Sequence, residues 1–83
     1  MKEYLFTIHL VGNDKNGNAL VYVYAAWKDR DEQGWRNFTP NELKGLNLGR
    51  VVKGRYITTQ MYSNEVTERL LNEYGNTCSF LYL

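Results

Sequence analysis

Two runs of strand-type residues joined by an Asn-Gly turn occupy the first third of this 83-residue chain and most constrain its fold. Residues 3–11, EYLFTIHLV, and residues 19–27, ALVYVYAAW, are rich in aromatic and β-branched side chains, which favour strands. Asn16 and Gly17 both tolerate the positive φ that a tight hairpin turn requires. The pattern predicts an antiparallel hairpin, and its second strand, apolar on both faces, is expected at the centre of a sheet.

The strongest helix signal is the sequence FTPNEL that follows. Thr39 is a good N-cap residue, and Pro40 suits the first helical position. Glu42 completes a capping box, and Phe38 and Leu43 stand where a hydrophobic staple packs. A short first helix is therefore predicted to begin here.

The second half of the chain contains a strand, a helix and a final strand. The third strand is predicted from Arg55 to Tyr62. The second helix is predicted to begin after a cap at Ser63 or Asn64 and to stop at Gly75. Residues 77–83, TCSFLYL, are predicted to form the last strand.

The predicted order of elements is β-β-α-β-α-β. Because 83 residues hold only one core, we expect a single α+β domain over residues 1–83. The order favours a sheet of about four mainly antiparallel strands with two short helices on one face. A helix between the third and fourth strands permits a parallel crossover there.

Composition excludes several classes of protein. The net charge of +1 is low for a dedicated nucleic-acid binder. A single cysteine allows no internal disulfide and fits a reducing compartment. The N-terminal residues lack the pattern of a signal peptide, and no apolar run reaches the roughly 18 residues of a membrane span. These features predict a cytoplasmic protein with no membrane partner.

The motifs that could carry chemistry are incomplete. Residues 29–34, DRDEQG, resemble the start of a calcium loop, but Pro40 stands where that loop needs a bidentate Glu. His9 and Cys78 could form a thiol–imidazole couple if the two terminal strands pair, although a cysteine in such an apolar strand is typically a packed residue. The sequence therefore predicts no enzyme, no cofactor, no catalytic residue and no metal site.

One stretch concentrates positive charge. Residues 43–64 contain four Lys or Arg residues and no Asp or Glu. The stretch is either a grip for phosphates or a surface strand that balances acidic neighbours. Trp35 and Arg36, in the preceding loop, are of the types enriched at binding hot spots, although Trp35 could instead fold back over the sheet edge. The predicted partner-binding residues are Trp35, Arg36, Arg50, Lys53, Arg55 and Tyr56.

The tyrosines support the same reading. A sheet with one helix-covered face leaves the other face open, and a tyrosine-rich open face is a plausible contact surface. Several of five tyrosines are expected there: Tyr22, Tyr24, Tyr56, Tyr62 and Tyr82.

The aromatic surplus, the near-zero net charge and the missing catalytic set predict a small non-enzymatic protein that binds another protein. In size and in its Asn- and Tyr-rich composition the chain is similar to accessory proteins of phages and mobile elements. Such proteins often inhibit or modulate a host protein or defence complex, as anti-CRISPR-like and anti-restriction inhibitors do. The alternative is a nucleic-acid-binding accessory protein that uses the basic strand Arg50–Tyr56, directly or within a larger complex. Pairing of sheet edges would also allow a homodimer.

Overall fold

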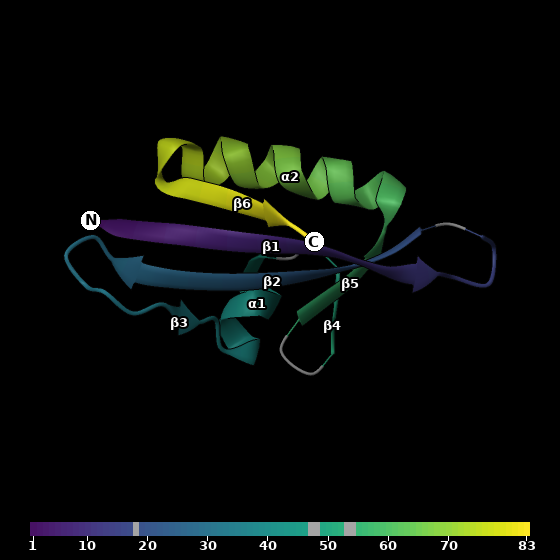
Figure 1. Ribbon diagram of the computed structural model, residues 1–83, viewed down its shortest axis with the longest axis horizontal. Helices are drawn as coiled ribbons and strands as arrows, with labels where there is room; N and C mark the ends of the chain where they lie inside the picture. The colour runs from purple at the N-terminus through teal and green to yellow at the C-terminus, as the bar shows by residue number, and fades with distance from the viewer. Residues whose placement is uncertain (18, 47–48, 53–54) are drawn as a thin grey trace.

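A computed structural model describes residues 1–17, 19–46, 49–52 and 55–83 (Figure 1). At residues 19, 52 and 56–65 it describes the backbone alone. The elements in chain order are β1 (Lys2–Asn13), β2 (Ala19–Asp29), β3 (Arg36–Asn37), α1 (Pro40–Leu46), β4 (Arg50–Val52), β5 (Arg55–Thr59), α2 (Gln60–Tyr74), a 3-10 turn (Gly75–Thr77) and β6 (Cys78–Tyr82).

The predicted N-terminal hairpin is confirmed. β1 and β2 pair antiparallel along their whole length, with Phe6 opposite Ala25. At the tip, the Gly17 amide donates a hydrogen bond to the Asp14 carbonyl at 3.1 Å, and Gly17 has a φ of +83°. That left-handed conformation is the one for which Gly is preferred, so the Asn-Gly signal fixed the turn.

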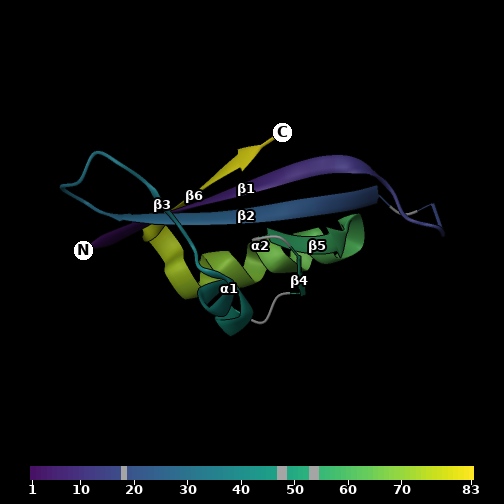
Figure 2. The ribbon, with the colours of Figure 1, turned by 90° about the horizontal axis from the view of Figure 1, so that it is seen from below.

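The predicted α+β class is also confirmed. The strand order is β4-β5-β2-β1-β6, with β3 paired to β2, and every pairing is antiparallel except that of β1 with β6. Both helices lie on one side of β1 and β2 (Figure 2). The connection through α2 does not place β6 beside β5, because β2 and β1 lie between them.

The start of the second helix was predicted too late. β5 ends at Thr59 and α2 begins at Gln60, rather than at a cap on Ser63 or Asn64. Thr59 pairs with Leu20 at the beginning of β2, so no further partner strand exists to extend β5. The two short strands β3 and β4 were not predicted, because two or three residues are too few to show a periodic pattern.

The core lies between the sheet and the helices. The capping box is formed: the Glu42 amide donates to Thr39 Oγ1 at 3.2 Å, and the Thr39 amide donates to Glu42 Oε1 at 3.1 Å. This cap starts α1 where Leu43 becomes fully buried. The buried apolar residues form one cluster: Phe6, Ile8, Val21, Val23, Ala25, Phe38, Leu43, Val66 and Leu70. Within the described part of the chain, no helix has the length and apolar character needed to cross a membrane.

Candidate functional site

The face of the sheet opposite the helices is the candidate site. Side chains alternate between the two faces of a strand, so the neighbours of the core residues point away from the core. No described helix or strand covers this side of β1 and β2 (Figure 2). We call this surface the open face and define it by Glu3, Leu5, Thr7, His9, Leu20, Tyr22, Tyr24, Ala26, Lys28, Arg50, Arg55, Ser79 and Leu81.

Aromatic rings form a row along the middle of the open face. Tyr22 lies between His9 and Tyr24, with its ring centroid 6.5 Å from each of theirs. The interplanar angles of 85° and 79° make both contacts edge-to-face, an arrangement that aromatic pairs favour. Tyr24 is 38% exposed, so the row is held in place by its own contacts but remains accessible to a partner.

Two arginines of the basic stretch lie at one end of this row. Arg55 Cζ is 4.2 Å from the centroid of the Tyr22 ring, which is cation–π distance. Arg55 Nε is buried and has no hydrogen-bond partner among the described residues. Arg50 is exposed, and its neighbour Val51 packs against the core, so Arg50 points to the open side.

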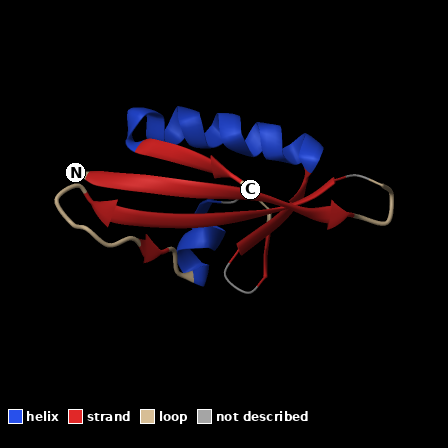
Figure 3. Cartoon of the chain, viewed as in Figure 1, coloured by secondary structure: helices blue, strands red, loops and turns tan. Residues whose placement is uncertain are grey.

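Trp35 lies at the other end of the open face. β5 and β3 pair with the same edge of β2, β5 along residues 20–23 and β3 along residues 26–27 (Figure 3). The Lys28 ammonium lies 5.4 Å from the centre of the Trp35 ring and 3.5 Å from Glu3 Oε2. Trp35 is 44% exposed, so it both packs on Lys28 at the sheet edge and presents ring surface to solvent.

Arg36 does not join Trp35 in one patch. Its guanidinium carbon lies 4.8 Å from the ring of Trp27, which packs against the core on the helix side. Its Nη2 donates to both carboxylate oxygens of Glu32, at 2.8 and 2.9 Å. Neighbours on a strand point to opposite faces, and this alternation separates the two predicted residues.

The other two predicted residues are only partly tested. Lys53 lies outside the described residues. Tyr56 pairs through its backbone with Val23 and Val51, and its side chain is not described. The structure therefore places Trp35, Arg50 and Arg55 on or beside the open face, and Arg36 on the other side of the strand.

Sequence reasoning missed the part that His9 and Lys28 play in this surface. Both residues stand at alternate positions of the hairpin strands, and β1 pairs His9 with Tyr22. The alternation places them on the face opposite Phe6 and Val23. This signal was visible in the sequence, but it identifies the open face only once the helix-covered face is known.

The proposed thiol–imidazole couple is not formed. β1 and β6 do pair, but the register sets Cys78 beside Tyr4, five residues before His9 on β1. Five residues of strand span roughly 16 Å, and the odd spacing places the two side chains on opposite faces. Burial raises the pKa of the Cys78 thiol, which lowers its thiolate fraction.

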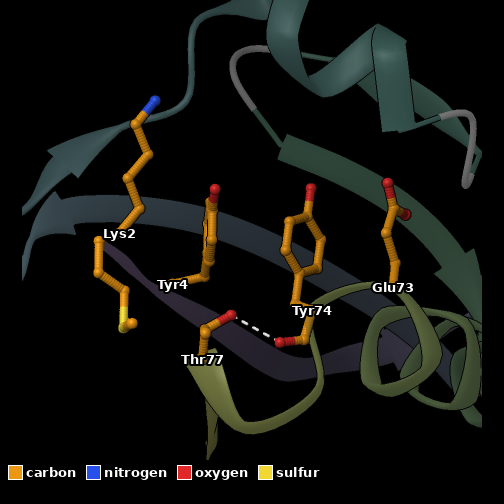
Figure 4. Close-up of a pocket in the computed structure, with 6 residues that line it drawn as sticks. Lys2, Tyr4, Glu73, Tyr74 and Thr77 are labelled. Atoms are coloured by element: carbon orange, nitrogen blue, oxygen red, sulfur yellow. Dashed lines mark hydrogen bonds between the residues drawn. The ribbon is translucent and has the colours of Figure 1, made fainter.

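A surface pocket of about 570 Å³ lies on the helix side, between the start of β1 and the end of α2 (Figure 4). Tyr4 and Tyr74 stand between Lys2 and Glu73 in this pocket, with their ring centroids 4.3 Å apart. The only other polar contact drawn there is the hydrogen bond from Thr77 Oγ1 to the Tyr74 carbonyl. Within the described ranges, no three His, Cys, Asp or Glu residues gather into a potential metal site.

Searches of protein-family models, of curated proteins and of solved structures found no match to this chain.

Proposed function

We propose that this protein is a non-enzymatic binding protein whose open face docks on an acidic surface of a protein partner. The observation that carries the proposal is the row of accessible rings, His9, Tyr22 and Tyr24, with cations at both of its ends. Aromatic side chains bury a large area at low entropic cost, which is why Tyr, Trp and Arg dominate binding hot spots.

The charge of the open face supports an acidic partner. Its defining residues include three cations, Lys28, Arg50 and Arg55, and one carboxylate, Glu3. Lys28 is neutralised locally by Glu3 at 3.5 Å. Arg55 has an N–H group without a described partner, and a carboxylate brought by another protein would satisfy it. Complementary charge of this kind fixes orientation and speeds association.

A protein partner fits this face better than nucleic acid does. Binding of single strands depends on phosphate contacts and on bases that stack flat on rings. The Arg55 guanidinium occupies one face of Tyr22, and the neighbouring rings stand nearly perpendicular to it, so they offer no common stacking plane. With Lys28 paired, Arg50 and Arg55 could contact about two phosphates, which gives weak binding.

The nucleic-acid alternative is favoured by one observation, the shared position of Arg50 and Arg55 beside Tyr22. It predicts that a short single-stranded oligonucleotide binds at low salt and that the affinity falls steeply as salt is added. Fluorescence anisotropy measures this directly. A flat titration at low salt would exclude the alternative.

The small size of the chain supports a role as an accessory protein that inhibits or modulates a host protein or defence complex. A domain of this size can act by covering a functional surface, because a standard interface needs only about 800 Å² from each partner. That the protein is not an enzyme stays a prediction.

A variant pair tests the proposed face. Arg55→Glu reverses a charge on the open face, and Arg69→Glu makes the same change at an exposed position of α2. Each purified protein is immobilised, exposed to lysate of the natural host cells with and without nuclease, and its captured proteins are quantified by mass spectrometry. We expect a nuclease-resistant protein that is retained by the wild type and Arg69→Glu and reduced about tenfold by Arg55→Glu.

Equal capture by both variants would contradict the proposal. Loss of every captured protein on nuclease treatment would favour the nucleic-acid alternative. Thermal unfolding of both variants checks that neither loss of binding comes from a loss of fold.

A further inference from the structure

β6 forms one edge of the sheet. It pairs with β1 on its inner side, and no described strand pairs with its outer side. The Leu83 amide donates to the Ile8 carbonyl at 2.8 Å, and the Leu83 carbonyl accepts from the Leu10 amide at 3.3 Å. Backbone groups alternate in direction along a strand, so the N–H and C=O groups of Phe80 and Tyr82 point away from β1.

This edge lacks the features that natural sheets use to prevent edge pairing. Such edges are short, charged, interrupted by Pro or distorted by a bulge. β6 is five residues long, CSFLY, with no charge, no Pro and an unshifted register against β1. The opposite edge, β4, is protected in both respects, because it has three residues and carries Arg50.

The side chains at this edge are also exposed and apolar. Leu81 is 48% exposed, Tyr82 64% and Leu83 65%, and Leu10 on the adjacent strand is 58% exposed. Large apolar side chains that gather at one edge mark an interaction site. An uncharged strand does not repel a copy of itself, whereas a charged strand would place like charges opposite one another.

We propose that two copies of this chain pair antiparallel through β6 and so form one continuous sheet with a twofold axis at Leu81. This inference does not depend on the proposed function of the open face. In this register Phe80 of one copy stands opposite Tyr82 of the other, and their outward backbone groups form two hydrogen-bonded pairs. The two Leu81 side chains meet at the axis as a non-hydrogen-bonded pair, in which Cα atoms approach to about 4.5 Å.

The register places the contact on the most exposed part of the strand. Exposure rises from half-buried Cys78 toward Leu83, so a strand centred on Leu81 avoids the junction where the 3-10 turn leads into β6. The interface is small, and interfaces of that class are typically weak and concentration-dependent. We therefore expect a monomer–dimer equilibrium rather than a permanent dimer.

Sedimentation equilibrium over a range of about 10–500 μM tests the association, since this range suits weak interfaces. The average mass of the wild type should rise from 9.7 kDa toward twice that value. Tyr82→Pro removes an outward N–H without touching the ladder to β1 and should keep the protein monomeric. Tyr82→Thr, which loses the same ring but keeps the N–H, should retain more association than Tyr82→Pro.

A disulfide assay tests the register. In a Cys78→Ser background, Leu81→Cys should form a symmetric intermolecular disulfide on mild oxidation, because the expected Cα separation lies within disulfide range. Leu71→Cys, at a similarly exposed position on α2, is the control and should remain largely reduced. A wild type that stays monomeric throughout, or Leu81→Cys that cross-links no better than Leu71→Cys, would overturn the proposal.

Discussion

The two faces of the central hairpin are built from alternate residues of the same strands, yet they have opposite character. On the covered face, Phe6 and Val23 are essentially fully buried against the helices. On the open face, His9, Tyr22 and Tyr24 contact one another and remain accessible. Since the strands and their pairing are shared, only the coverage by α1 and α2 distinguishes the two environments.

This difference separates stability from binding. A side chain packed on all sides contributes to the free energy of unfolding, whereas a half-exposed ring contributes little until a partner buries it. Residues of the covered face should therefore affect stability, and residues of the open face should affect association. The predictions below test this separation, from the largest expected effect to the smallest.

Replacement of adjacent residues on β1 gives the largest contrast. Phe6→Ala removes a fully buried ring and should lower the free energy of unfolding by about 3–5 kcal/mol. Leu5→Ala, on the half-buried open side, should cost less than half as much. Urea denaturation followed by circular dichroism measures both, and equal costs would show that the open face is also part of a packed core.

Loss of the helix cap should weaken the coverage of the core. Thr39→Ala removes the acceptor of the Glu42 amide hydrogen bond and should destabilise the protein by about 1 kcal/mol. The cost should show as a lower urea midpoint with an unchanged slope. An unchanged midpoint would mean that packing of Leu43 alone holds α1 in place.

The Cys78 thiol should react slowly in the native protein. Burial raises its pKa above the ordinary value of 9.0, so less thiolate is present at any pH below that value. Alkylation by iodoacetamide should be several-fold slower than in the urea-unfolded chain, and its pH midpoint should lie above 9.0. A midpoint below 9.0 would reopen thiol chemistry.

A change on the open face should have the smallest effect on stability. Tyr24→Ala should alter the free energy of unfolding by no more than about 0.5 kcal/mol, because the ring is 38% exposed and contacts Tyr22 only at its edge. Calorimetry of this variant beside the wild type is the measurement. A larger loss would assign Tyr24 to structure rather than to binding.

Local signals carried most of the fold. The Asn-Gly turn and the Thr39–Glu42 capping box involve residues a few positions apart, and the structure forms both. The boundary between β5 and α2 depended on where β2 begins, so the run of residues 55–62 could not reveal it. The placement of β6 beside β1 was likewise a matter of tertiary packing.

The site was predicted less completely than the fold. Trp35, Arg50 and Arg55 were selected by residue type, and they do lie at the open face. Arg36 was selected because it adjoins Trp35 in sequence, and strand alternation turns it to the other side. Composition finds residues suited to binding, but only the strand register decides which of them share a surface.

Site-specific photo-crosslinking tests the central claim most directly. Tyr24 is replaced by p-benzoyl-phenylalanine, and Leu71, comparably exposed on α2, receives the same group as the control. The variants are irradiated in the natural host cells, and cross-linked products are identified after nuclease treatment. The account predicts a protein adduct at Tyr24 that is absent or much weaker at Leu71. No adduct at Tyr24, or equal yields at both positions, would contradict it.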